Sequence, residues 1–160
     1  MPFRSLTIAR SAMLVHNAAI DISAQNVANV ETEGYHRQRP VIVADDHRLI
    51  RSGLRTLLDS YPDIHVIGEA CNGEEAVEMA GRMRPDAVIM DVNMPRMNGI
   101  QATRAIKRDY PDIVVIGLSV YNDRQIEAMM TKAGATIMLN KGGHPEDLYL
   151  ALREARAKPR

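Results

Sequence analysis

From residue 40 onward, short apolar runs alternate with segments whose apolar residues recur at helical spacing. The runs are short and lack polar alternation, which is typical of strands buried on both faces of a sheet. The predicted strands cover residues 41–44, 64–70, 87–90, 113–118 and 136–139. The predicted helices cover residues 49–61, 74–83, 100–110, 123–133 and 145–156. This alternation predicts an α/β fold with a parallel sheet, helices on both faces and right-handed crossovers.

Residues 1 to about 39 follow a different pattern. One apolar row recurs every seven residues, and a shorter second row lies on another face: Leu6, Met13, Ile20 and Val27, then Ile8, Val15 and Ile22. We predict a helix from about Leu6 to Ala28, which needs apolar partners on two sides. Gly34 interrupts the pattern, and residues 31–39 are typical of a polar extended connector. We therefore expect two parts, residues 1–39 and residues 40–160.

Length and composition narrow the class of protein. The 160 residues are enough for one domain with a core and a small appendage. Because 20 basic residues balance 20 acidic ones, no basic footprint for nucleic acid is present. The single cysteine, Cys71, favours a reducing compartment, and no apolar run approaches the roughly 18 residues of a membrane span. We expect a soluble cytoplasmic protein with no nucleic-acid or membrane partner.

Polar residues stand where the predicted strands stop. Asp45 and Asp46 follow the first strand, Asp91 follows the third, Ser119 the fourth and Lys141 the fifth. In a parallel sheet these ends lie along one edge, where open α/β proteins bind ligands. Three carboxylates, one hydroxyl and one lysine therefore predict a site for a divalent cation and a phosphoryl group.

The chemistry of these residue types makes the prediction more specific. Adjacent carboxylates repel each other unless a cation lies beside them, and oxygen ligands suit Mg²⁺ better than zinc. Asp91 is placed to act as a nucleophile that forms an acyl phosphate. Lys141 would pair with the phosphoryl oxygens and Ser119 would hydrogen-bond one of them. One such residue alone is more often a turn former or a solvated side chain, so the joint pattern carries the prediction.

The quoted residues resemble a known family. Residues 40–156 resemble the receiver domain of response regulators, in the subfamily that usually ends in a helix-turn-helix DNA-binding domain. The stretches that carry the resemblance are VADDH at 43–47, LIRSGL at 49–54 and DVNMPRMNG at 91–99. The resemblance implies a flavodoxin-like, five-stranded sheet in the order 2-1-3-4-5, with an extra N-terminal helix in this chain.

The resemblance also implies roles for individual residues. Asp91 would be the phosphoacceptor, Asp45 and Asp46 would be Mg²⁺ carboxylates, and Asn93 would give its backbone carbonyl to the metal. Ser119 and Lys141 match the switch hydroxyl and the phosphate-pairing lysine. The implied donor is a histidine kinase or a small acyl phosphate.

The chain departs from the family pattern at three places. Met138 stands where an aromatic residue is usual, and it can fill the same gap without a hydroxyl contact. Gly142 stands where proline is frequent. Since the sequence ends at Arg160, just after the last predicted helix, we expect this chain to lack a DNA-binding output.

The N-terminal segment resembles the N-terminal helix of flagellar rod, hook and hook-associated proteins. The residues that carry this resemblance are 26–30, Thr32, 34–35 and 37–38. In that family the motif ends a helix that packs with a C-terminal partner helix. An amphipathic helix followed by a turn is the plainer interpretation, and a natural fusion and a chimera both stay open.

Together these patterns predict a phosphoryl-accepting signalling switch of a two-component system, phosphorylated on Asp91 with Mg²⁺ as cofactor. We expect it not to be an enzyme, and to form a homodimer or a helix-mediated assembly. The alternative is a structural or assembly module that uses the N-terminal helix and carries a passive receiver. A third interpretation, a Mg²⁺-dependent phosphatase of the aspartyl-phosphate type, shares the chemistry. It is weaker, because the sequence shows no cap domain or substrate pocket.

Overall fold

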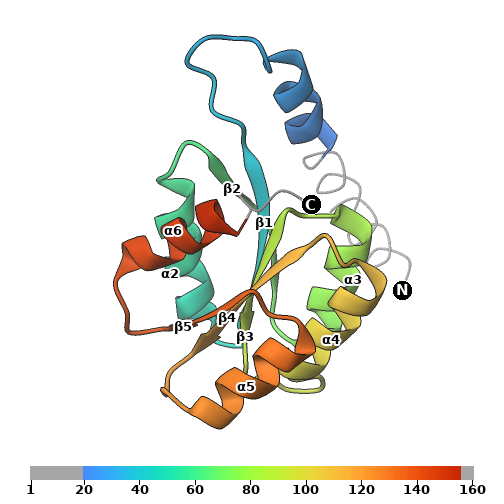
Figure 1. The fold of residues 1–160 in the computed structure, drawn as a ribbon, viewed down its shortest axis with the longest axis vertical. Coiled ribbons are helices and arrows are strands. Elements are labelled where there is room, and N and C mark those ends of the chain that lie inside the picture. Colours follow the sequence, from blue (N-terminus) through green and yellow to red (C-terminus); the bar gives the residue numbers. More distant parts are fainter. Residues whose placement is uncertain (1–19, 156–160) are drawn as a thin grey trace, which may run out of the picture.

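A five-stranded parallel sheet forms the centre of the computed structural model, which describes residues 20–155 (Figure 1). The strands pair in the order β2-β1-β3-β4-β5, so the predicted order is confirmed. Their bounds are β1 Arg39–Ala44, β2 Ile64–Ala70, β3 Ala87–Asp91, β4 Val114–Ser119 and β5 Ile137–Asn140.

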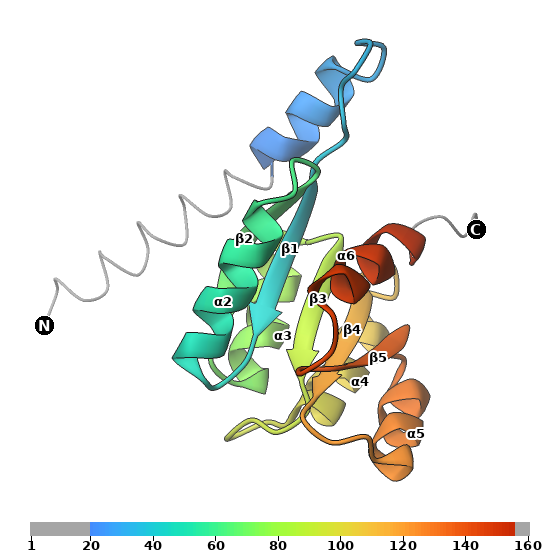
Figure 2. The same ribbon diagram turned by 90° about the vertical axis from the view of Figure 1, so that its left-hand side faces the viewer.

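Helices cover both faces of the sheet, as the alternating pattern predicts. The helices are α2 Arg48–Asp59, α3 Gly73–Met83, α4 Gly99–Asp109, α5 Arg124–Ala133 and α6 Pro145–Glu154. Figures 1 and 2 show α2 and α6 on one face and α3, α4 and α5 on the other.

The alternation of side chains along β1 builds two separate cores. Val41 and Val43 pack in one buried cluster with Leu58 of α2 and with residues of α6. Ile42 and Ala44 point the other way and join residues of α3, α4 and α5. Because successive residues of a strand face opposite sides, a strand buried on both faces must be apolar throughout. This requirement explains the continuous apolar runs in the sequence.

Some boundaries differ from the prediction by one or two residues. β1 begins at Arg39, whose N–H donates to the Asp63 carbonyl and extends the ladder with β2. Asp91 and Ser119 are the last residues of β3 and β4 because their backbones still pair with the neighbouring strands. A polar side chain can end an apolar run without ending the strand.

The N-terminal helix covers residues 20–28 within the described part, and the predicted stretch from Leu6 to residue 19 lies outside it. Ile22 is buried and belongs to the same cluster as the residues of α3, α4 and α5. Ile20 and Val27 are 53% and 75% exposed. Within residues 20–28, Ile22 of one predicted apolar face packs against the core of this chain, and Ile20 and Val27 of the other are open to solvent.

The segment after this helix folds back through the side chain of Asn26. Asn26 Nδ2 donates to the Gln38 carbonyl at 2.8 Å, and Asn26 Oδ1 accepts from the Gln38 N–H at 2.8 Å and the Tyr35 hydroxyl at 2.9 Å. Gly34 adopts the left-handed conformation needed in the turn, with φ +80°. Gln38 directly precedes β1, so these hydrogen bonds of Asn26 fix the helix near the amino end of the sheet (Figure 2).

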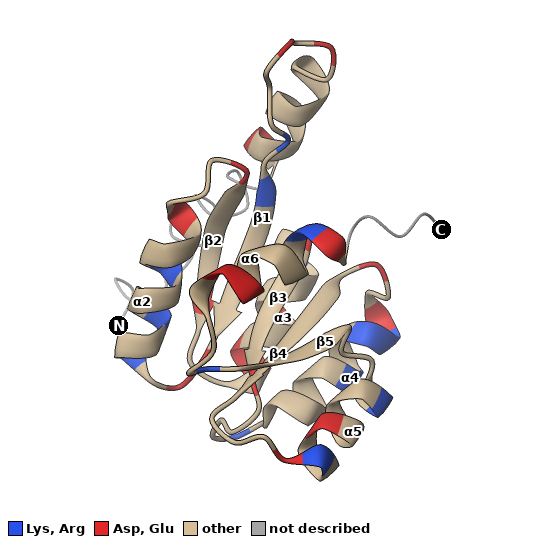
Figure 3. Ribbon diagram, turned by 60° about the vertical axis from the view of Figure 1, so that its left-hand side comes forward, with Lys and Arg blue, Asp and Glu red and all other residues tan. Residues whose placement is uncertain are grey.

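Charged residues are spread over the helices and loops with both signs mixed (Figure 3). Among residues 20–155, no helix is both long enough and apolar enough to cross a membrane.

Candidate functional site

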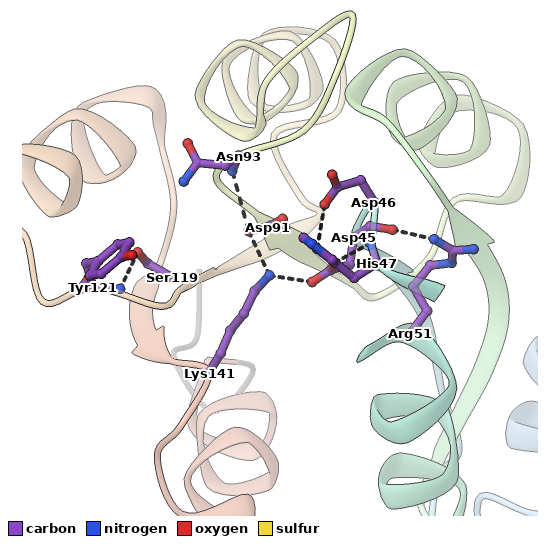
Figure 4. Close-up of polar contacts among 9 residues, drawn as sticks. All are labelled: Asp45, Asp46, His47, Arg51, Asp91, Asn93, Ser119, Tyr121 and Lys141. Atoms are coloured by element: carbon purple, nitrogen blue, oxygen red, sulfur yellow. Dashed lines mark hydrogen bonds and ion pairs between the residues drawn. The ribbon is translucent and has the colours of Figure 1, made fainter. Parts of the chain in front are cut away.

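An ammonium between two carboxylates forms the centre of the site (Figure 4). Asp45 directly follows β1, Asp91 ends β3 and Lys141 directly follows β5, so the carboxyl ends of three strands meet here. Lys141 Nζ lies 2.6 Å from Asp45 Oδ2 and 3.0 Å from Asp91 Oδ1. The side chains of Lys141, Asp45 and Asp91 are 9%, 1% and 5% exposed. The ion pairs are therefore shielded from the screening that weakens surface salt bridges.

The turn after β1 holds the acidic residues in place. Asp45 Oδ1 accepts from the backbone N–H of His47 at 2.8 Å. The His47 imidazole Nδ1 lies 2.9 Å from Asp46 Oδ1 and 3.3 Å from Asp45 Oδ1. Arg51, one turn into α2, donates to the Asp45 carbonyl at 2.6 Å. These contacts direct the Asp45 carboxylate inward and leave Asp46 exposed.

Sequence reasoning assigned no role to His47 and Arg51. A signal was available for Arg51, because a residue in the first turn of the helix that follows a strand lies over the preceding loop. No comparable signal marks His47, since its imidazole meets the carboxylates only through the shape of the turn.

The loop from Asp91 to Gly99 leads into α4. Asn93 N–H points at Asp91 Oδ1, 3.4 Å away, and the Asn93 side chain lies apart from the carboxylates (Figure 4). Gly99 N–H donates to the Val92 carbonyl at 2.8 Å. A Cβ on Gly99 would overlap the Asp91 carbonyl oxygen, so only glycine fits this close approach. Asn98 then begins α4 with a capping box, which anchors the far end of the loop.

Ser119 lies at the same edge, but its hydroxyl faces its own loop. Ser119 Oγ donates to the Tyr121 carbonyl at 3.0 Å and accepts from the Tyr121 N–H at 3.2 Å. The backbone N–H of Lys141 donates to the Ser119 carbonyl at 2.8 Å. The structure thus brings the Ser119 backbone next to Lys141 and directs the hydroxyl elsewhere (Figure 4).

Burial and charge both act on the titration of the central residues. Burial raises the pKa of Asp91, the Lys141 ammonium opposes this rise, and the Asp45 carboxylate adds to it. Burial acts to lower the pKa of Lys141, but its hydrogen bonds to Asp45 and Asp91 outweigh that effect and raise it. Lys141 therefore stays protonated at neutral pH, and it is the counter-charge that allows two carboxylates to be buried together.

The residues at this edge fit a divalent cation. Ligand atoms of Asp45, Asp46, His47 and Asp91 all lie within 4.8 Å of one another. The cluster holds three carboxylates, and Lys141 contacts two of them, so negative charge remains for a further cation. The oxygen-rich donor set suits Mg²⁺, which binds carboxylates and water, better than a metal that prefers sulfur or nitrogen.

The fold and this edge define a flavodoxin-like α/β protein with an acidic site at the carboxyl ends of its strands. Residues 41–153 match the family described as the response regulator receiver domain. The chain belongs to this family. It is 39% identical over 113 residues to the response regulator UvrY of Escherichia coli K12, which covers 71% of this chain and 52% of UvrY. The chain thus spans about half the length of this curated relative.

Solved structures agree with this assignment. The response regulator domain of Thermotoga maritima CheB superposes with a TM-score of 0.72 at 32% identity, over 77% of this chain and all of that domain (100%). The isolated receiver domain of Salmonella enterica RcsB, in the presence of phosphomimetic BeF3⁻, superposes with a TM-score of 0.69 at 27% identity. The match covers 77% of this chain and 92% of that chain. A longer Salmonella typhimurium RcsB chain superposes with a TM-score of 0.68 at 27% identity, over 74% of this chain and 59% of that chain.

The relatives bear on two of the expectations from sequence. The longer RcsB structure is described by its conformational dynamism for DNA interaction, so the expected absence of a nucleic-acid partner gains no support from the relatives. The family match favours a receiver in two-component signalling over a structural module with a passive receiver.

Proposed function

We propose that this chain is a phosphoryl-accepting switch of a two-component system and that Asp91 is its phosphoacceptor. The observation that carries the proposal is the Lys141 ammonium held between Asp45 and Asp91 in a buried edge of the sheet. A lysine at this position is available to an incoming phosphoryl group as soon as it releases a carboxylate. A surface ion pair would not serve in this way, because water would screen it.

The chemical step is the transfer of a phosphoryl group to the Asp91 carboxylate. A carboxylate oxygen attacks phosphorus and forms an O–P bond, while the P–N bond of a phosphohistidine or the P–O bond of an acyl phosphate breaks. The leaving group is the imidazole or the donor carboxylate, and Asp91 becomes an acyl phosphate. Lys141 pairs with the transferred phosphoryl oxygens, and the Ser119 hydroxyl gives a further hydrogen bond once it leaves the backbone of Tyr121.

Mg²⁺ is the cofactor that the cluster best fits. Asp45, Asp46, Asp91 and the backbone carbonyl of Asn93 would hold it. When bound, Mg²⁺ would neutralise negative charge on the phosphoryl group. The RcsB receiver studied with phosphomimetic BeF3⁻ supports the same chemistry in a relative with this fold. The proposed role is that of a phosphoryl acceptor and not of an enzyme. A cytoplasmic location is proposed because the single cysteine suits a reducing compartment.

The test is the intact mass of the protein after incubation with acetyl phosphate and Mg²⁺. We expect one phosphoryl adduct on the parent and none on Asp91→Asn, which keeps the shape of the side chain and removes the nucleophile. Asp86→Asn, at a carboxyl group outside the site, is the matched control and should be labelled like the parent. Labelling of Asp91→Asn at the parent level would overturn the proposal. Steady release of phosphate from small phosphomonoesters would favour a phosphatase instead.

A further inference from the structure

The side chain of Asn140 joins two loops that flank the site. Asn140 is the last residue of β5 and directly precedes Lys141. Its Nδ2 donates to the Val120 carbonyl at 3.2 Å and to Asn122 Oδ1 at 3.0 Å. Its Oδ1 accepts from the Gly142 N–H at 2.7 Å. One carboxamide thus ties the loop after β4 to the turn that carries Lys141.

The hydrogen bonds of Asn140 hold the residues on both sides of Tyr121, whose backbone binds the Ser119 hydroxyl. Ser119 Oγ makes both of its described hydrogen bonds with the backbone of Tyr121, and Val120 and Asn122 lie on either side of Tyr121. For the hydroxyl to turn toward Asp91, it must leave the Tyr121 backbone. As long as Asn140 holds both neighbours of Tyr121, the loop keeps the shape that accommodates the Ser119 hydroxyl turned away from Asp91.

There is space for the loop to change shape. A hollow of about 240 Å³ lies against it, lined among others by Ser119, Tyr121, Asn122 and Met138. Met138 itself lies across Gly117, where a Cβ would overlap its sulfur atom. Since a flexible methionine is one of the residues that line the hollow, movement of the loop need not break a rigid packed core.

We propose that Asn140 is a positioning residue that withholds the Ser119 hydroxyl from the phosphoryl site. Its two donated hydrogen bonds stabilise the loop in the state in which the Ser119 hydroxyl binds the Tyr121 backbone. Phosphorylation of Asp91 shifts the loop to a second state because it offers Ser119 a charged acceptor. This inference rests on the proposed function of Asp91. It adds a residue that sets how readily the site responds.

Two variants separate the tie from the rest of the side chain. Asn140→Ala removes all three hydrogen bonds without adding charge. Asn140→Asp keeps an oxygen for the Gly142 N–H and places a second oxygen against the Val120 carbonyl and Asn122 Oδ1, which are both acceptors. Asn122→Ala removes one of the two loop contacts and should give a smaller effect.

The measurement is a titration with beryllium fluoride and Mg²⁺, followed by the amide NMR signals of Ser119 and Tyr121. We expect the apparent dissociation constant of Asn140→Ala to fall roughly tenfold below that of the parent. We also expect these signals, before any fluoride is added, to lie part of the way toward their positions in the saturated parent. Asn140→Asp should show the same early shift, and its added charge should make the gain in affinity smaller.

The outcomes distinguish this inference from the proposed function. If the parent binds and both Asn140 variants bind equally or more weakly with unshifted amides, Asn140 has only a structural role and the inference is wrong. If the parent fails to bind and fails to take up phosphate, the proposed function falls and the inference falls with it. Thermal unfolding of each variant checks that the fold is retained, and Asn122→Ala provides the test if Asn140→Ala does not fold.

Discussion

Lys141 Nζ lies 2.6 Å from the buried Asp45 Oδ2 and so joins the end of β5 to the end of β1 across the strands between them. The same ammonium contacts Asp91 at the end of β3. A single side chain therefore neutralises two carboxylates that would otherwise repel each other in a region shielded from water. The ammonium that stabilises this edge of the sheet is therefore the same one that would pair with a phosphoryl group on Asp91.

The first prediction concerns the loss of this ammonium. Lys141→Met keeps most of the side-chain volume and leaves Asp45 and Asp91 buried without a counter-charge. We expect the free energy of unfolding to fall by about 3 kcal/mol at pH 7, since breaking a buried ion pair strands its partners. Urea unfolding without Mg²⁺ measures this change.

The matched control is Lys132→Met, at an exposed lysine in the last turn of α5, where we expect a change within about 0.5 kcal/mol. Excess Mg²⁺ should restore more stability to Lys141→Met than to the parent, because the cation takes over the neutralisation of the carboxylates. Absence of any stabilisation by Mg²⁺ in both proteins would contradict a metal site at this cluster.

The second prediction follows from the raised pKa of Asp91. Burial, partly offset by Lys141, makes the folded state hold the proton of Asp91 to higher pH than the unfolded state does. Stability from this group is therefore present below the ordinary pKa of an aspartate, about 3.9, and is lost as pH rises through the raised value. Asp91→Asn removes this loss, so we expect it to be more stable than the parent at pH 7.

The advantage of Asp91→Asn should shrink as the pH is lowered toward about 4, where the parent also becomes neutral at this position. Denaturant unfolding at a series of pH values measures the difference. Asp21→Asn, at an exposed carboxyl group on the N-terminal helix, should follow the parent throughout. An Asp91→Asn protein less stable than the parent at pH 7 would show that the contact with Lys141 outweighs burial.

The third prediction compares two glycines. Gly99→Ala places a methyl group on the Asp91 carbonyl oxygen and must push apart the loop and the start of α4. We expect a loss of about 2–3 kcal/mol and slower phosphorylation, because the same shift displaces Asp91. Gly53→Ala, in exposed α2 with nothing near the added methyl, should stabilise the protein by about 0.5–1 kcal/mol. Thermal unfolding of the pair measures both signs, and a harmless Gly99→Ala would contradict the close approach.

Much of the fold could be predicted because the physical signals are local. A strand buried on both faces needs an unbroken apolar run, and the helices between the runs show apolar residues at helical spacing. The convergence of Asp45, Asp91 and Lys141 also follows from sequence, since the carboxyl ends of parallel strands share one edge. The residue types then indicate the chemistry before any distance is known.

The remaining features depend on contacts that periodicity does not encode. The backbone of Tyr121 turns the Ser119 hydroxyl away from the site, and the role of Asn140 needs two loops to come within hydrogen-bond reach. The exposure of Ile20 and Val27 depends on which face of the N-terminal helix the receiver covers. Each of these is decided by the placement of one element on another.

The last prediction concerns the N-terminal segment and the division at residue 39. Asn26→Ala removes the three hydrogen bonds to Gln38 and Tyr35 that fold the connector back on its helix. Because these contacts lie outside the sheet, we expect local opening without loss of the main domain. Limited trypsin cleavage after Arg37 should become about fivefold faster, while urea unfolding of the sheet changes by less than about 0.5 kcal/mol. Asn29→Ala, which loses a bond to Gln25 within the helix end and a long one of 3.4 Å from the Thr32 hydroxyl but leaves the contacts of Gln38 intact, is the control and should be cleaved nearly like the parent. If Asn26→Ala instead destabilises the whole protein, the helix and the receiver form one cooperative unit and the division at residue 39 is wrong.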